Sequence, residues 1–267
     1  MESRTTAASG GRSPETGSSA RPSPPTGPRP ESESSSSGSK RRAKKRKRPT
    51  AARLFKFDRS FGARYVAGVD EAGRGSLAGP LVAAGVLIDL EGIGRSERRA
   101  LAWLNDSKQK TIEEREELFP CVLRAAACTS VAVRSVHAID GNGLHVSNLG
   151  ALADCLRAIS RDGAVLLVDG FPLPECELEH TPVVEGDARS AAIAAASVIA
   201  KVTRDRYMRR ADEIYPGWDF AGNVGYSTPE HREAILANGI SPLHRRSFAS
   251  VAYSQLELGA GDYREAA

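Results

Sequence analysis

The sequence has few cysteines and histidines and no long apolar run. Its 267 residues include 4 cysteines, without a CxxC pair, and 5 histidines. So few cysteines at this length argue against a disulfide framework, and their mostly apolar neighbours predict reduced, buried thiols. The longest small-apolar stretch, 190–200, falls short of the roughly 20 residues that a membrane helix needs. Since the start MESRTTAASGGRS also lacks an apolar signal core, we expect a cytoplasmic protein with no membrane partner.

An excess of positive charge is confined to the first 50 residues. They carry 12 Lys/Arg and 4 Asp/Glu, whereas the remaining chain carries 25 and 29, a net charge of −4. An acidic body can bind nucleic acid, but its phosphate contacts must then be local or assisted by metal ions. The Ser/Pro/Gly/Glu-rich residues 1–39 predict disorder. The run KRRAKKRKRP, residues 40–49, fits a non-specific nucleic-acid tether, a localisation signal or a solubilising arm.

The alternation of apolar segments predicts one globular domain over 64–267. Strands are predicted over 64–69, 81–88, 128–136 and 164–170. Helices are predicted over 96–104, 111–126, 151–160, 186–215 and 228–239. A lead-in segment, 51–63, should pack on this domain through its leucine and phenylalanines. Strands mixed with helices, without an internal repeat, indicate an α/β or α+β fold around a central sheet.

Four carboxylates stand where a buried chain rarely places charge without a reason. Asp70 and Glu71 end the first predicted strand, Asp169 ends another, and Asp187 lies at the N-cap or first turn of the long helix. Converging carboxylates repel one another in a partly dry site unless a cation lies among them. Oxygen ligands without His or Cys favour Mg²⁺ or Mn²⁺ over Zn²⁺, and two such ions about 4 Å apart are an established device for phosphodiester hydrolysis.

Each of these acids also has an ordinary structural interpretation. Asp187 alone fits a helix cap, Asp169 before a glycine fits a turn, and the Asp70–Glu71 pair fits a salt-bridged strand end. The occurrence of all four in one chain favours a shared site. The bare turn at 73–75 that follows Glu71 would let backbone groups approach a sugar or phosphate, although a simple tight turn between strands fits it too.

At these residues the sequence resembles ribonuclease HII, the bacterial type 2 ribonuclease H. The resemblance rests on GVDEAGRGSLAGP, NDSKQK, LLVDG, GDARSAAIAAASVIAKVTRDRYM, NVGYSTPEH and HRRSF, in the family's order over about 64–248. It implies an RNase H-like central mixed five-stranded sheet flanked by helices, with a C-terminal helical extension. It also implies a divalent-metal-dependent endonuclease that cleaves the RNA strand of RNA–DNA hybrids. The same resemblance implies incision 5′ of ribonucleotides embedded in duplex DNA, with 5′-phosphate and 3′-hydroxyl ends, as in ribonucleotide excision repair.

The resemblance assigns roles to ten positions of this chain. The metal-binding catalytic acids, with Mn²⁺ or Mg²⁺ as cofactor, correspond to Asp70, Glu71, Asp169 and Asp187. The substrate-binding positions correspond to Gly73, Arg74, Gly75, Lys108, Lys201 and Tyr226. Among these, the Gly-Arg-Gly turn contacts the ribose 2′-hydroxyl through backbone groups, the tyrosine stacks on the deoxyribose that follows, and the two lysines hold phosphates. Arg74 would serve either a phosphate or a neighbouring acid.

Three details qualify the resemblance. Ser76 stands where the family commonly has proline, and we expect it to loosen the turn. Gln109 replaces a common lysine, so any phosphate role there passes to Lys110. Lys201 follows Asp187 by 14 residues, about 21 Å along a continuous helix, which places it outside the metal centre. It would hold a more distant phosphate or be solvated.

Two other functions compete with this interpretation. The type HIII nucleases carry a folded substrate-binding domain ahead of the catalytic body, whereas residues 1–50 are of low complexity here. A non-catalytic nucleic-acid-binding protein would work through the basic run, but it would not need four acids. We therefore expect a monomeric enzyme whose basic tail adds non-specific nucleic-acid contact. His231 and His244 are expected at a helix surface or in packing, and Trp218 in the core.

Overall fold

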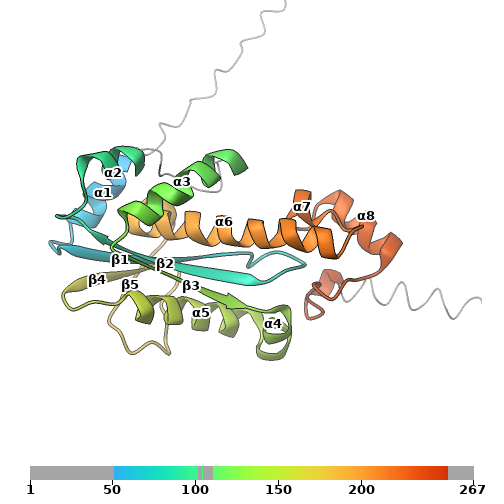
Figure 1. Cartoon of the computed structure of the whole chain (residues 1–267). Coiled ribbons are helices and arrows are strands. Elements are labelled where there is room, and N and C mark those ends of the chain that lie inside the picture. The colour runs from blue at the N-terminus through green and yellow to red at the C-terminus, as the bar shows by residue number, and fades with distance from the viewer. Residues whose placement is uncertain (1–50, 102–103, 105–110, 252–267) are drawn as a thin grey trace, which may run out of the picture. The chain divides into compact units, whose positions relative to one another are not determined.

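Five strands form a single mixed sheet, the centre of the fold (Figure 1). The computed structural model describes residues 51–101, 104 and 111–251. The strands are β1 (Tyr65–Ala72), β2 (Leu81–Asp89), β3 (Cys128–Arg134), β4 (Ala164–Asp169) and β5 (Thr181–Val183), in the order β3-β2-β1-β4-β5. The central strand β1 pairs antiparallel with β2 and parallel with β4. The mixed five-stranded sheet is therefore as predicted, although the short β5 was not located from the sequence.

Helices cover both faces of the sheet (Figure 1). One face carries α1 (Ala51–Arg59), α2 (Arg95–Ala100), α3 (Ile112–Ala125) and the long α6 (Ala191–Ile214). The other face carries α4 (Val136–Asn142) and α5 (Leu144–Ile159), while α7 (Phe220–Asn223) and α8 (Pro229–Asn238) lie at the C-terminal end of α6. In the described part of the chain, no helix combines the length and the apolar character needed to cross a membrane.

The central strand is buried on both sides, which explains its nearly continuous apolar sequence. Val66 packs in the core beneath α6, and Ala67 and Val69 pack in the core against α5. At Gly68 the helix approaches so closely that a Cβ atom would lie 2.4 Å from the backbone nitrogen of Ile193. This contact places the first turns of α6 directly across β1, next to the end of the strand that carries Asp70.

The start of α6 differs from the prediction. The helix begins at Ala191, and Ser190 is its N-cap, with a hydroxyl that accepts the N–H of Ile193 at 3.2 Å. Ser190 has extended backbone angles, φ −108° and ψ 135°, so the helix cannot continue backwards through it. Asp187 lies instead in a separate 3-10 turn, η3 (Gly186–Ala188). The prediction that Asp187 starts the long helix is therefore wrong.

The lead-in segment is part of the folded body, as predicted. Leu54 and Phe55 of α1 belong to the buried core beneath α6, and Phe57 packs against that core. Asp58 is fully buried, and its Oδ2 atom accepts the backbone N–H of Ala192 at 3.1 Å. Because that N–H belongs to the first turn of α6, α1 supplies a second cap to this helix.

The cysteines follow the prediction only in part. All four are free thiols, but only Cys155 is buried. Cys128 is exposed because it begins β3, an edge strand whose outer side has no neighbouring strand in the described sheet. The expectation of buried thiols is thus wrong for Cys128 and holds for Cys155, where burial raises the pKa of the thiol.

Candidate active site

Asp70 is a buried carboxylate near the C-terminal end of β1. Asp70 is only 2% exposed, and its Oδ1 atom accepts the backbone N–H of Glu71 at 2.7 Å. Its Oδ2 atom is buried, and within the described residues no hydrogen bond satisfies it. Burial raises the pKa of Asp70 well above its usual range, the charges of Asp169 and Glu71 raise it further, and the hydroxyl of Ser197 on α6 acts in the opposite direction.

Asp169 reaches the same edge of the sheet because β4 runs parallel to β1. The register pairs Val69 with Val168, so the next residues of the two strands are Asp70 and Asp169. The Oδ1 atom of Asp169 accepts the backbone N–H of Gly186 at 2.7 Å. That bond holds η3 at the end of β4, and η3 carries Asp187, which is 5% exposed. Parallel pairing thus brings Asp70 next to Asp169, and a turn rather than a helix start carries Asp187 to the end of β4.

Glu71 is set apart from Asp70 by the alternation of side chains along a strand. Successive residues of β1 point to opposite faces, so Glu71 and Asp70 approach a common edge from different sides. The Oε1 atom of Glu71 lies 3.8 Å from the Nη1 atom of Arg74. The Arg74 guanidinium also lies over the ring of Phe171, 5.0 Å from its centroid. Of the two roles predicted for Arg74, contact with a neighbouring acid is the one observed.

The acids suit a hard divalent cation, although they do not form a closed ligand shell. Within the described ranges, no three carboxylate, imidazole or thiol groups lie close enough to enclose a metal ion. The donors are nonetheless all carboxylate oxygens, as Mg²⁺ and Mn²⁺ prefer. Asp70 contributes a buried oxygen without a hydrogen-bond donor, and its ionised form is opposed by two neighbouring acids. A cation at this edge would bind the unsatisfied oxygen of Asp70 and offset the repulsion between the carboxylates.

The Gly-Arg-Gly turn after β1 is held tightly rather than loosely. Gly73 has φ +87°, and a Cβ atom there would lie 2.0 Å from the Nε atom of Arg204. The Ser76 hydroxyl donates to the Gly73 carbonyl at 2.9 Å and accepts the Nη2 group of Arg204 at 2.7 Å. Gly75 is exposed, and a Cβ atom added there would meet no atom within 4 Å. The prediction that Ser76 loosens the turn is wrong, because its hydroxyl links the turn to a buried guanidinium.

Tyr226 lies beside this turn, in the loop between α7 and α8. The preceding residue, Gly225, accepts the backbone N–H groups of Leu77 and Ala78 at 2.8 and 3.2 Å. Two cations of α6 flank the tyrosine ring, Lys201 Nζ at 5.3 Å and Arg204 Cζ at 5.4 Å from the centroid. The loop with Tyr226 and the glycine turn are therefore neighbours.

Lys201 is largely buried rather than solvated, and its predicted distance from Asp187 along one helix does not apply. Its side chain is 18% exposed, and its Nζ atom pairs with Asp205 at 2.7 Å. Asp187 is not on α6, so a 14-residue spacing along that helix does not define the position of Lys201. Ser197, which faces Asp70, precedes Lys201 by one helical turn, about 6 Å along the axis. Lys108, Gln109 and Lys110 lie outside the described residues.

Comparison with known proteins identifies the family. The model of the family Ribonuclease HII matches residues 67–251. The chain belongs to the ribonuclease HII family. Ribonuclease HII of Geobacillus kaustophilus (strain HTA426) is 44% identical over 201 residues, which cover 74% of each chain. Members of this family are ribonucleases H, so the chain is an endoribonuclease that acts on RNA–DNA hybrids.

Solved structures of related nucleases share the fold. The ribonuclease H2 from Pyrococcus horikoshii OT3 superposes with a TM-score of 0.60 at 27% identity, covering 72% of this chain and 98% of that one. The RNase HII from Archaeoglobus fulgidus, solved in a complex with PCNA, superposes with a TM-score of 0.59 at 28% identity, covering 71% and 96%. The fold predicted from the ribonuclease HII motifs is therefore confirmed.

Several residues around the ribonuclease HII site were not found from the sequence. Arg204 and Arg245 are fully buried, although arginine is normally a surface residue and no periodicity marks it otherwise. His231 and His244 were expected at a surface or in packing; both are buried, with their Nε2 atoms 3.1 Å apart. The packing interpretation is confirmed and the surface one is wrong. Trp218 packs on Phe220 at 6.1 Å, partly buried, as a core residue.

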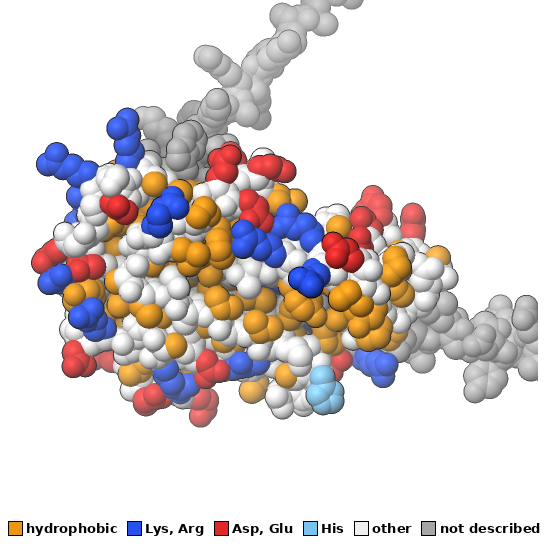
Figure 2. All heavy atoms as spheres, viewed as in Figure 1, with side chains coloured by type: hydrophobic (Ala, Val, Ile, Leu, Met, Phe, Trp, Pro, Cys, Tyr) orange, Lys and Arg blue, Asp and Glu red, His pale blue; other side chains and the backbone are white. Residues whose placement is uncertain are grey.

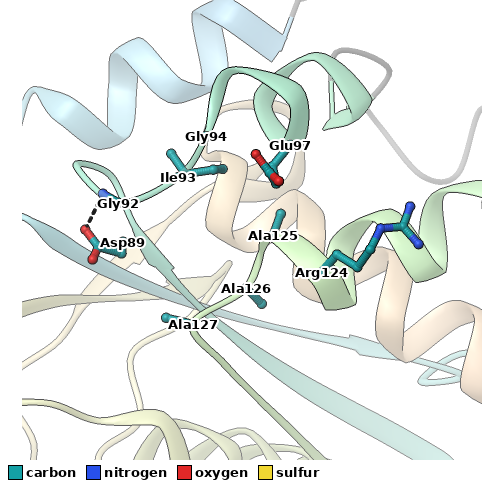
Figure 3. A pocket seen from close by; sticks show the side chains of 9 residues that line it. All are labelled: Asp89, Gly92, Ile93, Gly94, Glu97, Arg124, Ala125, Ala126 and Ala127. Carbon is teal, nitrogen blue, oxygen red and sulfur yellow. Dashed lines mark hydrogen bonds between the residues drawn. The ribbon is translucent and has the colours of Figure 1, made fainter.

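A separate hollow carries none of the predicted site residues of this ribonuclease HII (Figure 3). It lies between the end of β2, the start of α2 and the α3–β3 connection, and its charged lining is Asp89, Glu97 and Arg124. Asp89 already accepts the N–H of Gly92 at 2.9 Å and pairs with Arg64. Its carboxylate is therefore committed to structural contacts.

Charges of both signs are interspersed over the face shown in Figure 2. Arg206 and Arg209 on α6 both pair with Glu116 of α3. Between α3 and α6, one carboxylate is thus shared by two arginines.

Proposed function

We propose that the carboxylate edge formed by β1, β4 and η3 hydrolyses the phosphodiester on the 5′ side of a ribonucleotide. The substrates are the RNA strand of RNA–DNA hybrids and single ribonucleotides embedded in duplex DNA. The products carry 5′-phosphate and 3′-hydroxyl ends. The observation that carries this proposal is the buried Asp70, whose pKa is raised by burial and by Asp169, next to a glycine turn whose loop is hydrogen-bonded to the loop of Tyr226.

Mg²⁺ or Mn²⁺ is the proposed cofactor, held by Asp70, Glu71, Asp169 and Asp187. A divalent cation supplies positive charge that stabilises the transition state at phosphorus and makes water a better nucleophile. The chain itself contributes carboxylate oxygens whose orientation is fixed by backbone N–H groups. The Gly186 N–H orients the Asp169 carboxylate, and the Glu71 N–H orients that of Asp70.

The turn at Gly73 and Gly75 is proposed to recognise the ribose of the ribonucleotide. With no side chains there, backbone N–H and C=O groups can lie within hydrogen-bond distance of a ribose 2′-hydroxyl. Tyr226 is proposed to stack on the following deoxyribose, where a 2′-hydroxyl would clash with the ring. These two contacts together favour a ribonucleotide followed by DNA.

Phosphates are proposed to bind Lys201, Lys108 and Arg74. Lys201 lies against Tyr226 and pairs with Asp205, so a phosphate near the tyrosine would compete with that carboxylate. Arg74 lies between Glu71 and the ring of Phe171 and has a side chain 38% exposed, which leaves it open to the substrate. The basic run 40–49 is proposed to add non-specific contact with nucleic acid.

The decisive experiment is cleavage of an end-labelled duplex DNA with one ribonucleotide, with the cut mapped to a single nucleotide. We expect one incision, 5′ of the ribonucleotide, and a 5′-phosphate on the downstream product. A cut at another position, or cleavage of hybrids alone, would contradict the proposal. A chain lacking residues 1–50 should cleave with the same position but bind duplex more weakly, with a smaller salt dependence.

A further inference from the structure

Arg204 is a buried cation in the C-terminal half of α6 with an unusual set of partners. Its relative exposure is 0%, and within the described residues it forms no salt bridge with a carboxylate. A buried guanidinium is costly unless its N–H groups are satisfied. Arg204 meets this requirement through four hydrogen bonds, all to backbone carbonyls or a hydroxyl.

These acceptors come from two loops that the proposed function places on the substrate. On the β1–β2 loop, Nε donates to the Pro80 carbonyl at 2.9 Å, and Nη2 donates to the Ala78 carbonyl at 2.9 Å and to the Ser76 hydroxyl at 2.7 Å. On the α7–α8 loop, Nη1 donates to the Val224 carbonyl at 2.8 Å. The planar fork of one arginine therefore spans both loops.

Ser76 carries this link into the glycine turn itself. Its hydroxyl accepts from Arg204 and donates to the Gly73 carbonyl at 2.9 Å. The side chain of Arg204 also fills the space beside Gly73, where a Cβ atom would clash with it. The guanidinium therefore fixes the turn by contact and through one hydroxyl.

The same guanidinium lies against Tyr226 on the opposite side. Its Cζ atom is 5.4 Å from the ring centroid, and its bond to Val224 anchors the backbone two residues before the tyrosine. A second buried arginine supports the turn from the C-terminal segment, because Arg245 donates to the carbonyls of Gly79 and Arg74, each at 3.0 Å. Arg204 is the one of the two that joins the turn to the tyrosine.

We propose that Arg204, acting through Ser76, is a positioning residue that fixes the spacing between the glycine turn and Tyr226 and so sets the preference for a ribonucleotide followed by DNA. This inference rests on the proposed function, which assigns the turn to the ribose and the tyrosine to the next sugar. Neither Arg204 nor Ser76 needs to touch the substrate. They act by fixing the distance between the turn that contacts the ribose and the tyrosine that contacts the next sugar.

The test compares two substrates in each protein. The full-length enzyme, Ser76→Ala and Arg204→Lys are assayed for kcat/KM on duplex DNA with one ribonucleotide and on a continuous RNA–DNA hybrid. The control is Ser147→Ala, which removes the hydroxyl of another buried serine, one that donates to the Ala138 carbonyl on the opposite face of the sheet. Melting temperatures of all variants record any general loss of stability.

We expect the ratio of the two kcat/KM values to fall about 3- to 10-fold in Ser76→Ala, as for one lost hydrogen bond. In Arg204→Lys it should fall roughly 10-fold or more, because an ammonium cannot reach acceptors on both loops at once. Ser147→Ala should keep the wild-type ratio. A general structural defect would instead lower both activities together and leave the ratio unchanged.

The outcomes separate this inference from the proposed function. If the wild-type protein shows no incision at single ribonucleotides, the proposed function fails and this inference fails with it. If the wild type discriminates and both variants keep its ratio, only the inference is overturned. Should Arg204→Lys not fold, the ratio in Ser76→Ala decides alone, since that change leaves the other three bonds of Arg204 in place.

Discussion

The backbone N–H of Gly186 donates a 2.7 Å hydrogen bond to the Oδ1 atom of Asp169. This contact joins the end of β4 to the turn η3 and thereby sets where Asp187 stands relative to Asp169. Two of the four predicted acids are thus positioned by one backbone group. The positions of both acids therefore require glycine at residue 186, where a Cβ atom would clash with Asp169 and Ile193.

Gly186→Ala should disturb the site more than the fold. An added Cβ atom would lie 2.9 Å from Asp169 Oδ1 and 2.5 Å from the Cδ1 atom of Ile193, so the turn and the carboxylate must shift apart. We expect hybrid cleavage to fall roughly 10-fold or more, with a loss of about 1 kcal/mol in the free energy of unfolding. Gly141→Ala is the matched control, because it meets no atom within 4 Å. Equal effects of the two changes would refute the positional role of Gly186.

Asp70→Asn should lower the cleavage rate roughly 100-fold or more and leave duplex binding within about twofold, because it removes a proposed cation ligand. Without metal, the variant should melt at a higher temperature than the wild type, since burial, Asp169 and Glu71 all oppose the ionised form of Asp70. Asp154→Asn, at a side chain 50% exposed, is the control. Normal activity of Asp70→Asn at ordinary Mg²⁺ would rule out the proposed site.

Asp58 should make stability depend on pH in a definite direction. Burial raises its pKa from 3.8 to about 6. The folded state therefore binds a proton more tightly than the unfolded chain, and stability is lost as the pH rises from about 4 through 6. Asp58→Asn keeps an acceptor for the Ala192 N–H without the charge, so its advantage over wild type should grow across this window to about 2–3 kcal/mol. Denaturant unfolding of both proteins at pH 4 and 7.5 measures this difference in the free energy of unfolding. The same difference at both pH values would contradict a raised pKa at Asp58.

The His231–His244 pair should make stability depend on pH in the opposite direction, with a loss at low pH. Burial lowers the pKa of both imidazoles, and with the His231 charge it brings that of His244 from 6.5 to about 4. The unfolded chain then binds protons that the folded state excludes, so stability should fall by about 1 kcal/mol per pH unit as the pH drops from 6.5 towards 4. His244→Asn should flatten this slope, whereas His145→Gln, at an exposed residue, should retain it. An unchanged slope in His244→Asn would exclude the pair as its source.

The sheet could be predicted from the sequence because its strands are long apolar runs, but β5 could not. That strand has only three residues, Thr181–Val183, and a proline in the middle, so no alternation marks it. The helix α6 was predicted by its apolar residues, and its start was misplaced because Ser190, an equally good cap, stands three residues after Asp187.

The sequence predicts which residues form the candidate site, but not how the structure positions them. Asp70 and Asp169 were recognised because charge ends an apolar strand, whereas their adjacency follows from the parallel pairing of β1 with β4, which no local pattern reveals. The burial of Arg204 could not be predicted, because the local sequence around a buried helical arginine does not differ from that around an exposed one. The role of Ser76 was misjudged for the same reason, since its partner is 128 positions away.

The capping of α6 by α1 also extends the folded body beyond the region of the family match. The family match begins at residue 67, yet α1, with Leu54, Phe55 and Asp58, lies wholly before it. A chain shortened to the matched region would uncover apolar surface of the core beneath α6 and leave the Ala192 N–H without its acceptor. Residues 51–59 therefore belong to the folded body of the enzyme, even though the family match begins after them.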